Sequence, residues 1–115
     1  MKVYGIPNCD TVKKSTTWLK DNGIEYEFHN FKKEGITESK LKEWAAQIGW
    51  EAIINKKSST WRDLDQETKD SITTAKAAFK LIQEKTSLIK RPVVESNKGI
   101  LQGFDQDVYK ANLLK

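Results

Sequence analysis

The side chain best suited to chemistry in this sequence is that of Cys9, the only cysteine among 115 residues. It follows a short β-prone segment and a Pro-containing turn, and it comes just before a predicted helix. A thiol in that place faces unpaired backbone N–H groups and the positive end of the helix dipole, which favour the thiolate. We therefore expect a reactive nucleophile. The alternative is a small buried hydrophobic side chain, a common role of free cysteines.

The charges beside the thiol act in opposite directions. Asp10 disfavours a neighbouring thiolate, whereas Lys13 can offset it if the helix begins at Asp10 or Thr11, because residues four apart share a helical face. A solvated lysine is the equally plausible alternative for Lys13. With one cysteine and one histidine, His29, the chain has no internal disulfide and no zinc-type ligand cluster.

The N-terminal third predicts the elements that position this thiol. Residues 2–6 alternate as a strand, residues 11–21 have the apolar spacing of a helix that Asn22-Gly23 ends, and residues 24–31 alternate as a second strand. A helical crossover between two strands predicts that they are parallel. His29 is expected to be a strand residue without a catalytic role.

The centre of the chain predicts helices. Thr37 is a plausible N-cap for a helix that Gly49 ends, and further helices are expected at residues 60–64 and 72–82. Residues 50–55 suit either a strand or an irregular connection, and residues 56–60 suit a polar loop. Three tryptophans are assigned to packing: Trp18, Trp44 and Trp50.

The C-terminal part predicts a β-hairpin followed by a helix. After Pro92, residues 93–95 and 100–102 flank a turn at residues 97–99, and residues 105–114 suit a final helix with Asp105 at its favourable start. The predicted order is therefore βαβ, a helical insert and ββα within a single domain spanning residues 1–115. Ligands of open α/β sheets gather at the carboxyl ends of parallel strands, where Cys9 would lie.

Composition limits the classes of partner. The net charge of +4 and pI of about 9.1 favour anionic partners only moderately. Nucleic acid binding is not expected, because no basic stripe is interleaved with aromatic residues. No apolar run approaches the length of a membrane span, and no signal-peptide core follows Met1, so a cytoplasmic protein is expected.

Three motifs together resemble one family. Cys9-x-x-x-Lys13, Thr60-Trp61-Arg62 and Lys90-Arg91-Pro92-Val93-Val94 are similar to those of the ArsC/Spx/YffB family of arsenate reductase-like proteins. Near the N-terminus, Tyr4-Gly5-Ile6 and Cys9-Asp10-Thr11 are most similar to the corresponding motifs of the YffB-like branch. The resemblance implies an α/β thioredoxin-like fold with a mixed sheet, formed by residues of about 1–34 and 88–115, with a helical insert at about 35–87.

The arsenate reductases of the family use a cysteine to attack arsenate and three arginines to hold it. The cysteine corresponds to Cys9 and one arginine to Arg91, whereas the second falls near Lys56 and Lys57. The position of the third arginine falls within residues 100–104. This segment contains Gln102 but no arginine. Lysine is a point charge and arginine a planar clamp, so arsenate reduction is the less favoured alternative.

The Spx branch contains transcription regulators that bind RNA polymerase and sense oxidation through Cys-x-x-Cys. Here Val12 stands at the second cysteine position. The resemblance therefore leaves a non-catalytic, Spx-like protein that docks on a partner such as RNA polymerase as the second hypothesis, without the usual disulfide switch.

The leading hypothesis is a thiol oxidoreductase that acts as a glutathione-dependent monothiol reductase. With no resolving cysteine in the chain, an external thiol must release the Cys9 adduct, and glutathione is expected as co-substrate, with no bound cofactor. Similar thioredoxin-like proteins use a cis proline beside the thiol to bind extended backbone, and X-Pro bonds can be cis. The expected binding residues are Asn8, Thr11, Lys13, Lys57, Arg62, Arg91 and Pro92.

For Arg91 and Arg62, a role outside the binding site is also compatible with the sequence. Arg91 would hold a carboxylate or oxyanion near Cys9, but it is also compatible with a plain surface arginine. Arg62 and the neighbouring Trp61 would line the same cleft, or would serve at the surface and in the core.

Overall fold

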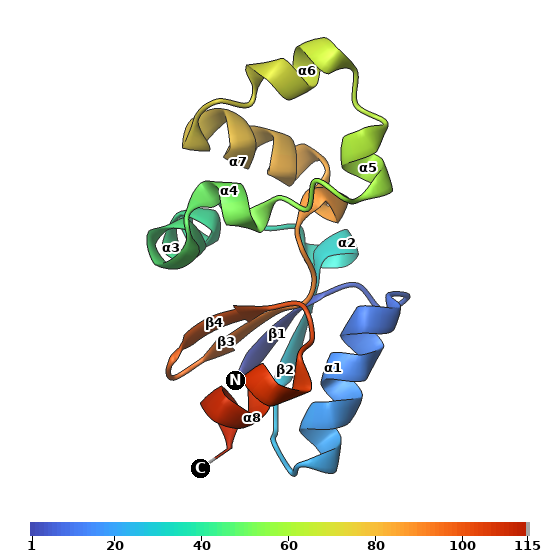
Figure 1. Cartoon of the computed structure of the whole chain (residues 1–115), viewed down its shortest axis with the longest axis vertical. Coiled ribbons are helices and arrows are strands. Elements are labelled where there is room, and N and C mark those ends of the chain that lie inside the picture. Colours follow the sequence, from blue (N-terminus) through green and yellow to red (C-terminus); the bar gives the residue numbers. More distant parts are fainter. Residues whose placement is uncertain (115) are drawn as a thin grey trace. The chain divides into compact units, whose positions relative to one another are not determined.

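The computed structural model describes residues 1–114 and divides the chain into two compact units. The first consists of Met1–Glu34 with Arg91–Lys115, and the second of Gly35–Lys90. The first contains a mixed sheet with the strand order β2-β1-β3-β4 (Figure 1). Its strands are β1 (Lys2–Gly5), β2 (Glu27–Asn30), β3 (Val93–Ser96) and β4 (Gly99–Gln102).

The pairing in this sheet agrees with the predicted thioredoxin-like topology. β1 and β2 are parallel, whereas β3 is antiparallel to both β1 and β4. The unit also contains three helices, α1 (Asp10–Asp21), α2 (Phe31–Glu34) and α8 (Gln106–Leu113). The crossover through α1 explains why β1 and β2 run in the same direction.

Helices α1 and α8 pack on one face of the sheet (Figure 1). Val3 and Val94 are opposite each other on β1 and β3, so both point toward this face. The core they form with the helices consists of Val3, Trp18, Leu19, Val94 and Tyr109. The apolar stripe of α1 thus fixes the orientation of the helix that begins beside Cys9.

The second unit is helical and is built from short elements. Its helices are α3 (Glu38–Ile48), α4 (Trp50–Ile53), α5 (Ser59–Arg62), α6 (Gln66–Ser71), α7 (Ala75–Glu84) and the 3₁₀ turn η1 (Thr86–Leu88). The side chains of Trp44, Ile53 and Ile82 are fully buried here. An isolated antiparallel bridge joins Ile54 to Ile89.

Hydroxyl and carboxylate N-caps set the starts of α3, α5, α6, α7 and α8. The Thr37 hydroxyl accepts from the Lys40 N–H at 3.1 Å, and the Asp65 carboxylate accepts from the Thr68 N–H at 2.7 Å. Ser58, Thr74 and Asp105 cap α5, α7 and α8 in the same way. Each cap satisfies N–H groups that have no partner within the helix, which is why short helices begin at these residues.

Several predicted boundaries were wrong. Residues 24–26 are not part of β2, because the Ile24 N–H donates to the Leu19 carbonyl at 2.9 Å and so completes the end of α1. Residues 50–53 form α4 rather than a strand or an irregular connection. Helix α6 was not predicted, because none of its residues is buried and it therefore has no apolar stripe. Helix α7 begins at Ala75, after its Thr74 cap, and not at residue 72.

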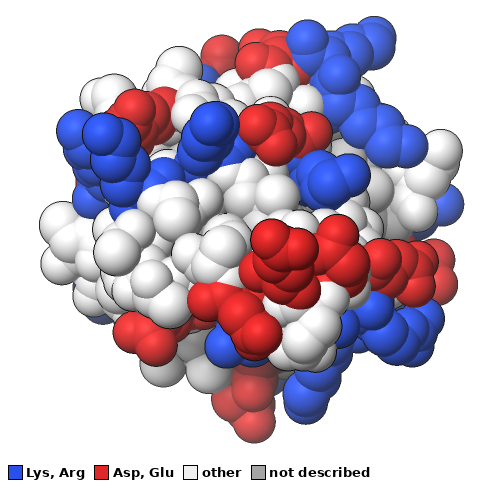
Figure 2. Space-filling model, turned by 90° about the horizontal axis from the view of Figure 1, so that it is seen from above, with Lys and Arg blue, Asp and Glu red and all other residues white. Residues whose placement is uncertain are grey.

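Within residues 1–114, no helix combines the length and apolar character that crossing a bilayer requires. Figure 2 shows lysine and arginine side chains interspersed with aspartate and glutamate side chains on the face in view. The basic groups on that face are therefore partly neutralised by acidic neighbours.

Candidate functional site

Cys9 is the N-cap residue of α1. Its backbone is extended, with φ −119° and ψ 122°, and its carbonyl accepts the Lys13 N–H at 2.9 Å. The thiol is half-buried and makes no capping hydrogen bond. Helix α1 begins at Asp10, so the first N–H groups of the helix and its positive dipole end lie beside the sulfur. The half-buried sulfur is within reach of a reagent.

Gly5 allows α1 to start close to β1. A Cβ at Gly5 would lie 2.8 Å from Cγ2 and 3.3 Å from Cγ1 of Val12, which is buried on the first turns of α1. Real Cβ atoms essentially never approach another atom that closely. The glycine therefore determines how near the thiol-bearing end of the helix approaches the strand.

Arg91 and Pro92 lie at the end of β1 from which the chain leads to Cys9. Tyr4 is opposite Val93 in the antiparallel pair, so the residues before Val93 run alongside the residues that follow Tyr4. The Arg91–Pro92 peptide bond is cis, Pro92 is buried and Arg91 is half-buried. The Pro92 carbonyl accepts the Gly103 N–H at 2.9 Å. The structure thus brings two of the expected site residues to the thiol end of the sheet.

The other expected residues fall into two groups. Asn8, Thr11 and Lys13 flank Cys9 along the chain, with Asn8 and Lys13 exposed and Thr11 half-buried. Lys57 and Arg62 belong to the unit Gly35–Lys90, where both are exposed. Their proposed contribution to the site stays a prediction.

The surroundings of Lys57 and Arg62 within their unit are well defined. The Lys57 N–H donates to Asn55 Oδ1 at 3.0 Å, and the Arg62 carbonyl accepts from Lys69 Nζ at 3.2 Å. Trp61 is half-buried, and Lys56 Nζ lies 5.5 Å from the centre of its ring. The Trp61 side chain therefore presents an aromatic face to a cation.

A set of residues that the sequence analysis missed connects α1 to the turn after β4. Ser15 Oγ lies 2.8 Å from Tyr109 Oη, and the Tyr109 hydroxyl donates to the Gly103 carbonyl at 2.6 Å. Burial raises the pKa of Tyr109, and the hydrogen bond with Ser15 opposes this rise. The available signal was a serine on the apolar stripe of α1, three residues after Val12 and three before Trp18.

His29 packs among aromatic rings. Its ring centre lies 4.8 Å from that of Tyr4 and 5.7 Å from that of Phe31, and its Nδ1 lies 3.8 Å from Glu34 Oε2. Tyr4 in turn donates to Glu95 Oε1 at 2.9 Å. These contacts give His29 a packing role at the end of β2.

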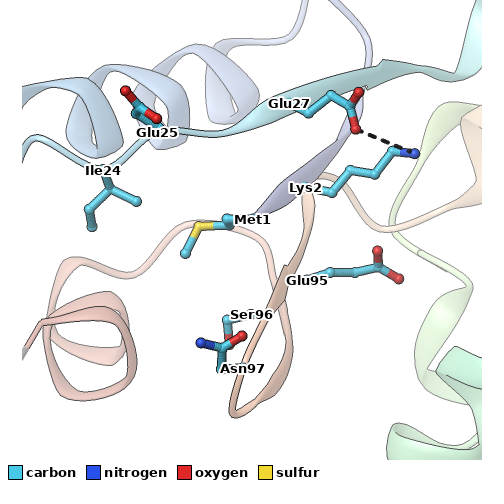
Figure 3. Close-up of a pocket in the computed structure, with 8 residues that line it drawn as sticks. All are labelled: Met1, Lys2, Ile24, Glu25, Glu27, Glu95, Ser96 and Asn97. Atoms are coloured by element: carbon cyan, nitrogen blue, oxygen red, sulfur yellow. Dashed lines mark ion pairs between the residues drawn. The ribbon is translucent and has the colours of Figure 1, made fainter.

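A pocket of about 520 Å³ lies at the start of β1, whereas Cys9 follows the end of that strand (Figure 3). It is lined by Met1, Lys2, Ile24, Glu25, Glu27, Glu95, Ser96 and Asn97. Lys2 Nζ is 3.9 Å from Glu27 Oε2, and Glu25 and Glu95 also belong to the lining. Because the pocket is at the opposite end of β1 from Cys9, we do not assign it to the thiol chemistry.

Comparison with known proteins identifies the family. The model of the ArsC family matches residues 4–112, which is nearly the whole chain. The chain belongs to the ArsC family. The thioredoxin-like α/β fold predicted for this chain is the ArsC fold.

Individual ArsC-family relatives resemble the chain over most of its length. A solved YffB protein is 39% identical, with a TM-score of 0.91 and 97% coverage of both chains. An uncharacterized protein of Haemophilus influenzae is 40% identical over 95% of both chains. The global transcriptional regulator Spx of Listeria innocua is 28% identical over 91% of this chain and 80% of its own length.

Proposed function

We propose that this ArsC-family protein is a glutathione-dependent monothiol reductase in which Cys9 is the nucleophile. The observation that carries the proposal is the position of Cys9 as the N-cap of α1, at the end of β1 that Arg91 and Pro92 border. A half-buried thiol at a helix start is accessible to a disulfide.

The proposed cycle has two exchanges. The Cys9 thiolate attacks the glutathione sulfur of a mixed disulfide, so that a Cys9–glutathione disulfide forms and the substrate leaves as a thiolate. A glutathione thiolate then attacks the adduct at the glutathione sulfur, releasing the Cys9 thiolate and glutathione disulfide. Glutathione supplies both electrons, and no second cysteine of the chain takes part, since Val12 stands at the place of a Cys-x-x-Cys partner.

Cations near the thiol would attract the carboxylates of glutathione. Lys13 is exposed one turn into α1, and Arg91 can form a bidentate pair with a carboxylate. We assign Asn8 and Thr11 to polar contacts with the tripeptide. The helix N-terminus stabilises the Cys9 thiolate as the leaving group in the second exchange.

The test uses glutathione disulfide and intact-mass measurement. We expect the purified protein to gain the mass of one glutathione at Cys9, and added glutathione to remove it. Cys9→Ser must abolish the adduct. Arg91→Ala is expected to slow its formation about tenfold, as loss of a charge-assisted pair would. If the wild-type protein forms no adduct, the proposal is wrong.

A second candidate is regulation by docking on a partner such as RNA polymerase. The similarity to Spx over 91% of the chain supports it. This function does not need the thiol, so Cys9→Ser would still capture RNA polymerase as well as the wild-type protein does. Capture that is retained, together with the absence of a glutathione adduct, would favour docking over the reductase.

Arsenate is the least favoured substrate. Arg91 is present, but lysines stand near a second arginine position and Gln102 stands in the segment of the third. Without a bidentate clamp at either position, the grip on a tetrahedral oxyanion is weak. We expect no arsenate reduction under conditions in which glutathione disulfide modifies Cys9.

A further inference from the structure

A continuous series of hydrogen bonds runs from helix α1 to Pro92. It passes from Ser15 to Tyr109 at 2.8 Å, from Tyr109 to the Gly103 carbonyl at 2.6 Å, and from the Gly103 N–H to the Pro92 carbonyl at 2.9 Å. A phenol has one proton, and Tyr109 donates it to Gly103. Ser15 must therefore donate its proton to Tyr109.

The middle of this series is shielded from water. Ser15 is fully buried, and Tyr109 is 1% exposed. The Tyr109 ring meets Trp18 and Phe104 edge to face, with ring centres 5.4 and 5.1 Å away. The hydroxyl is thus held in one place by packing, and its loss would leave the Ser15 hydroxyl without its acceptor and the Gly103 carbonyl without this donor.

We propose that Tyr109 is a positioning residue that fixes Cys9 relative to the Arg91–Pro92 segment. Ser15 lies on the helix that Cys9 caps, and Gly103 is bonded to Pro92. The inference rests on the proposed reductase function, which requires both parts to contact one substrate. It adds a residue of the last helix to a site otherwise formed at the start of α1 and before β3.

Directional bonds add a restraint along the helix axis to the one that apolar packing supplies. The core contacts of α1 are non-directional, so they resist separation from the sheet more than small shifts along it. A hydrogen bond weakens steeply when its angle or length departs from the optimum. A displacement of about 1 Å between reacting groups can slow a reaction about a hundredfold.

The test compares two reagents for Cys9. Iodoacetamide is small and uncharged and reports the thiol by itself, whereas glutathione disulfide must also contact the Arg91–Pro92 segment. In Tyr109→Phe we expect alkylation within about twofold of the wild-type rate. Adduct formation with glutathione disulfide should be about tenfold slower, the equivalent of one hydrogen bond of ordinary strength.

A matched control and a weaker variant accompany it. Tyr26→Phe removes the hydroxyl of a half-buried tyrosine, for which no hydrogen bond is found within residues 1–114, and it should change neither rate. Ser15→Ala removes one bond of the series and keeps the Tyr109–Gly103 bond, so it tests the idea even if Tyr109→Phe folds poorly. The double variant should slow the glutathione reaction by less than the product of the two single effects, because both remove the same bond.

Amide hydrogen exchange adds a readout that does not depend on the reaction. The Gly103 N–H should exchange about tenfold faster in Tyr109→Phe than in the wild type and in Tyr26→Phe. Unchanged Gly103 exchange overturns the positioning role. A wild-type adduct together with an unchanged ratio of the two Cys9 rates overturns it as well. No adduct in the wild type overturns the reductase function itself, which separates the two failures.

Discussion

Substitution of Gly5 by alanine is expected to displace the thiol-bearing end of α1. The added Cβ would lie 2.8 Å from Val12 Cγ2, whereas ordinary contacts begin at 3.4 Å, so one of the two elements must move by about 0.6 Å. Val12 is 3% exposed and β-branched, and its side chain has little freedom to turn away. The strain of inserting one methyl group into a packed core is about 1–3 kcal/mol.

The net change in the free energy of unfolding is smaller than this strain. Alanine lowers the entropy of the unfolded chain and so offsets about 0.5–1 kcal/mol. We expect Gly5→Ala to destabilise the protein by about 1–2 kcal/mol in urea denaturation. The Cys9 alkylation rate should change at the same time, because the displaced end of α1 carries that thiol.

A control and a rescue separate this effect from general destabilisation. Gly23 has φ +68° and no atom within 4 Å of its added Cβ, so Gly23→Ala should cost about 1 kcal/mol without altering Cys9 reactivity. Val12→Ala removes the clashing methyl groups, and it should cost less in the Gly5→Ala background than alone by about 1 kcal/mol or more. Additive effects, or a stability of Gly5→Ala within about 0.5 kcal/mol of the wild type, would refute the close-approach argument.

Two further predictions concern groups of the same unit. Because burial raises the pKa of Tyr109, the stability it contributes is full below the pKa of an unfolded tyrosine, about 10, and is lost as pH rises through the higher folded value. Urea denaturation between about pH 9 and pH 11 should show a steeper fall for the wild type than for Tyr109→Phe, and parallel curves would contradict this. Gln102 Nε2 is buried without a hydrogen-bond partner within residues 1–114, so Gln102→Met should stabilise the protein by about 1 kcal/mol, whereas Met at the exposed Gln106 should have almost no effect. A loss of stability in Gln102→Met would show that the amide has a partner in solution.

The elements that carry a local chemical signal were predictable from the sequence. The Thr37 cap, the Asn22-Gly23 stop and the hairpin turn after Pro92 each act within a few residues, and the structure has α3, α1 and the β3–β4 pair there. Helix α6 has only its Asp65 cap as a signal, and without a buried face that signal was too weak to be recognised.

Part of the candidate site was likewise predictable from local sequence patterns, and part depends on how the chain folds. Cys9 at a helix start and Arg91 before a proline are local patterns, and both could be found from the sequence. The bond between Ser15 and Tyr109 joins residues 94 positions apart, and its existence depends on how α1 and α8 pack on the sheet. A buried serine on an apolar stripe shows that some partner must exist, but it does not say which.

The absence of a second cysteine makes the geometry at Cys9 more demanding. In a dithiol protein the second thiol is tethered close to the adduct, so it resolves the adduct at a high effective concentration. An external thiol has no such tether and must be guided to the adduct by the site. That requirement favours a sulfur that stays half-exposed, cations that face solvent, and a fixed distance between the helix and the Arg91–Pro92 segment. Cys9 is half-exposed and Lys13 is exposed to solvent. The hydrogen bonds of Tyr109 can keep the distance between α1 and the Arg91–Pro92 segment constant.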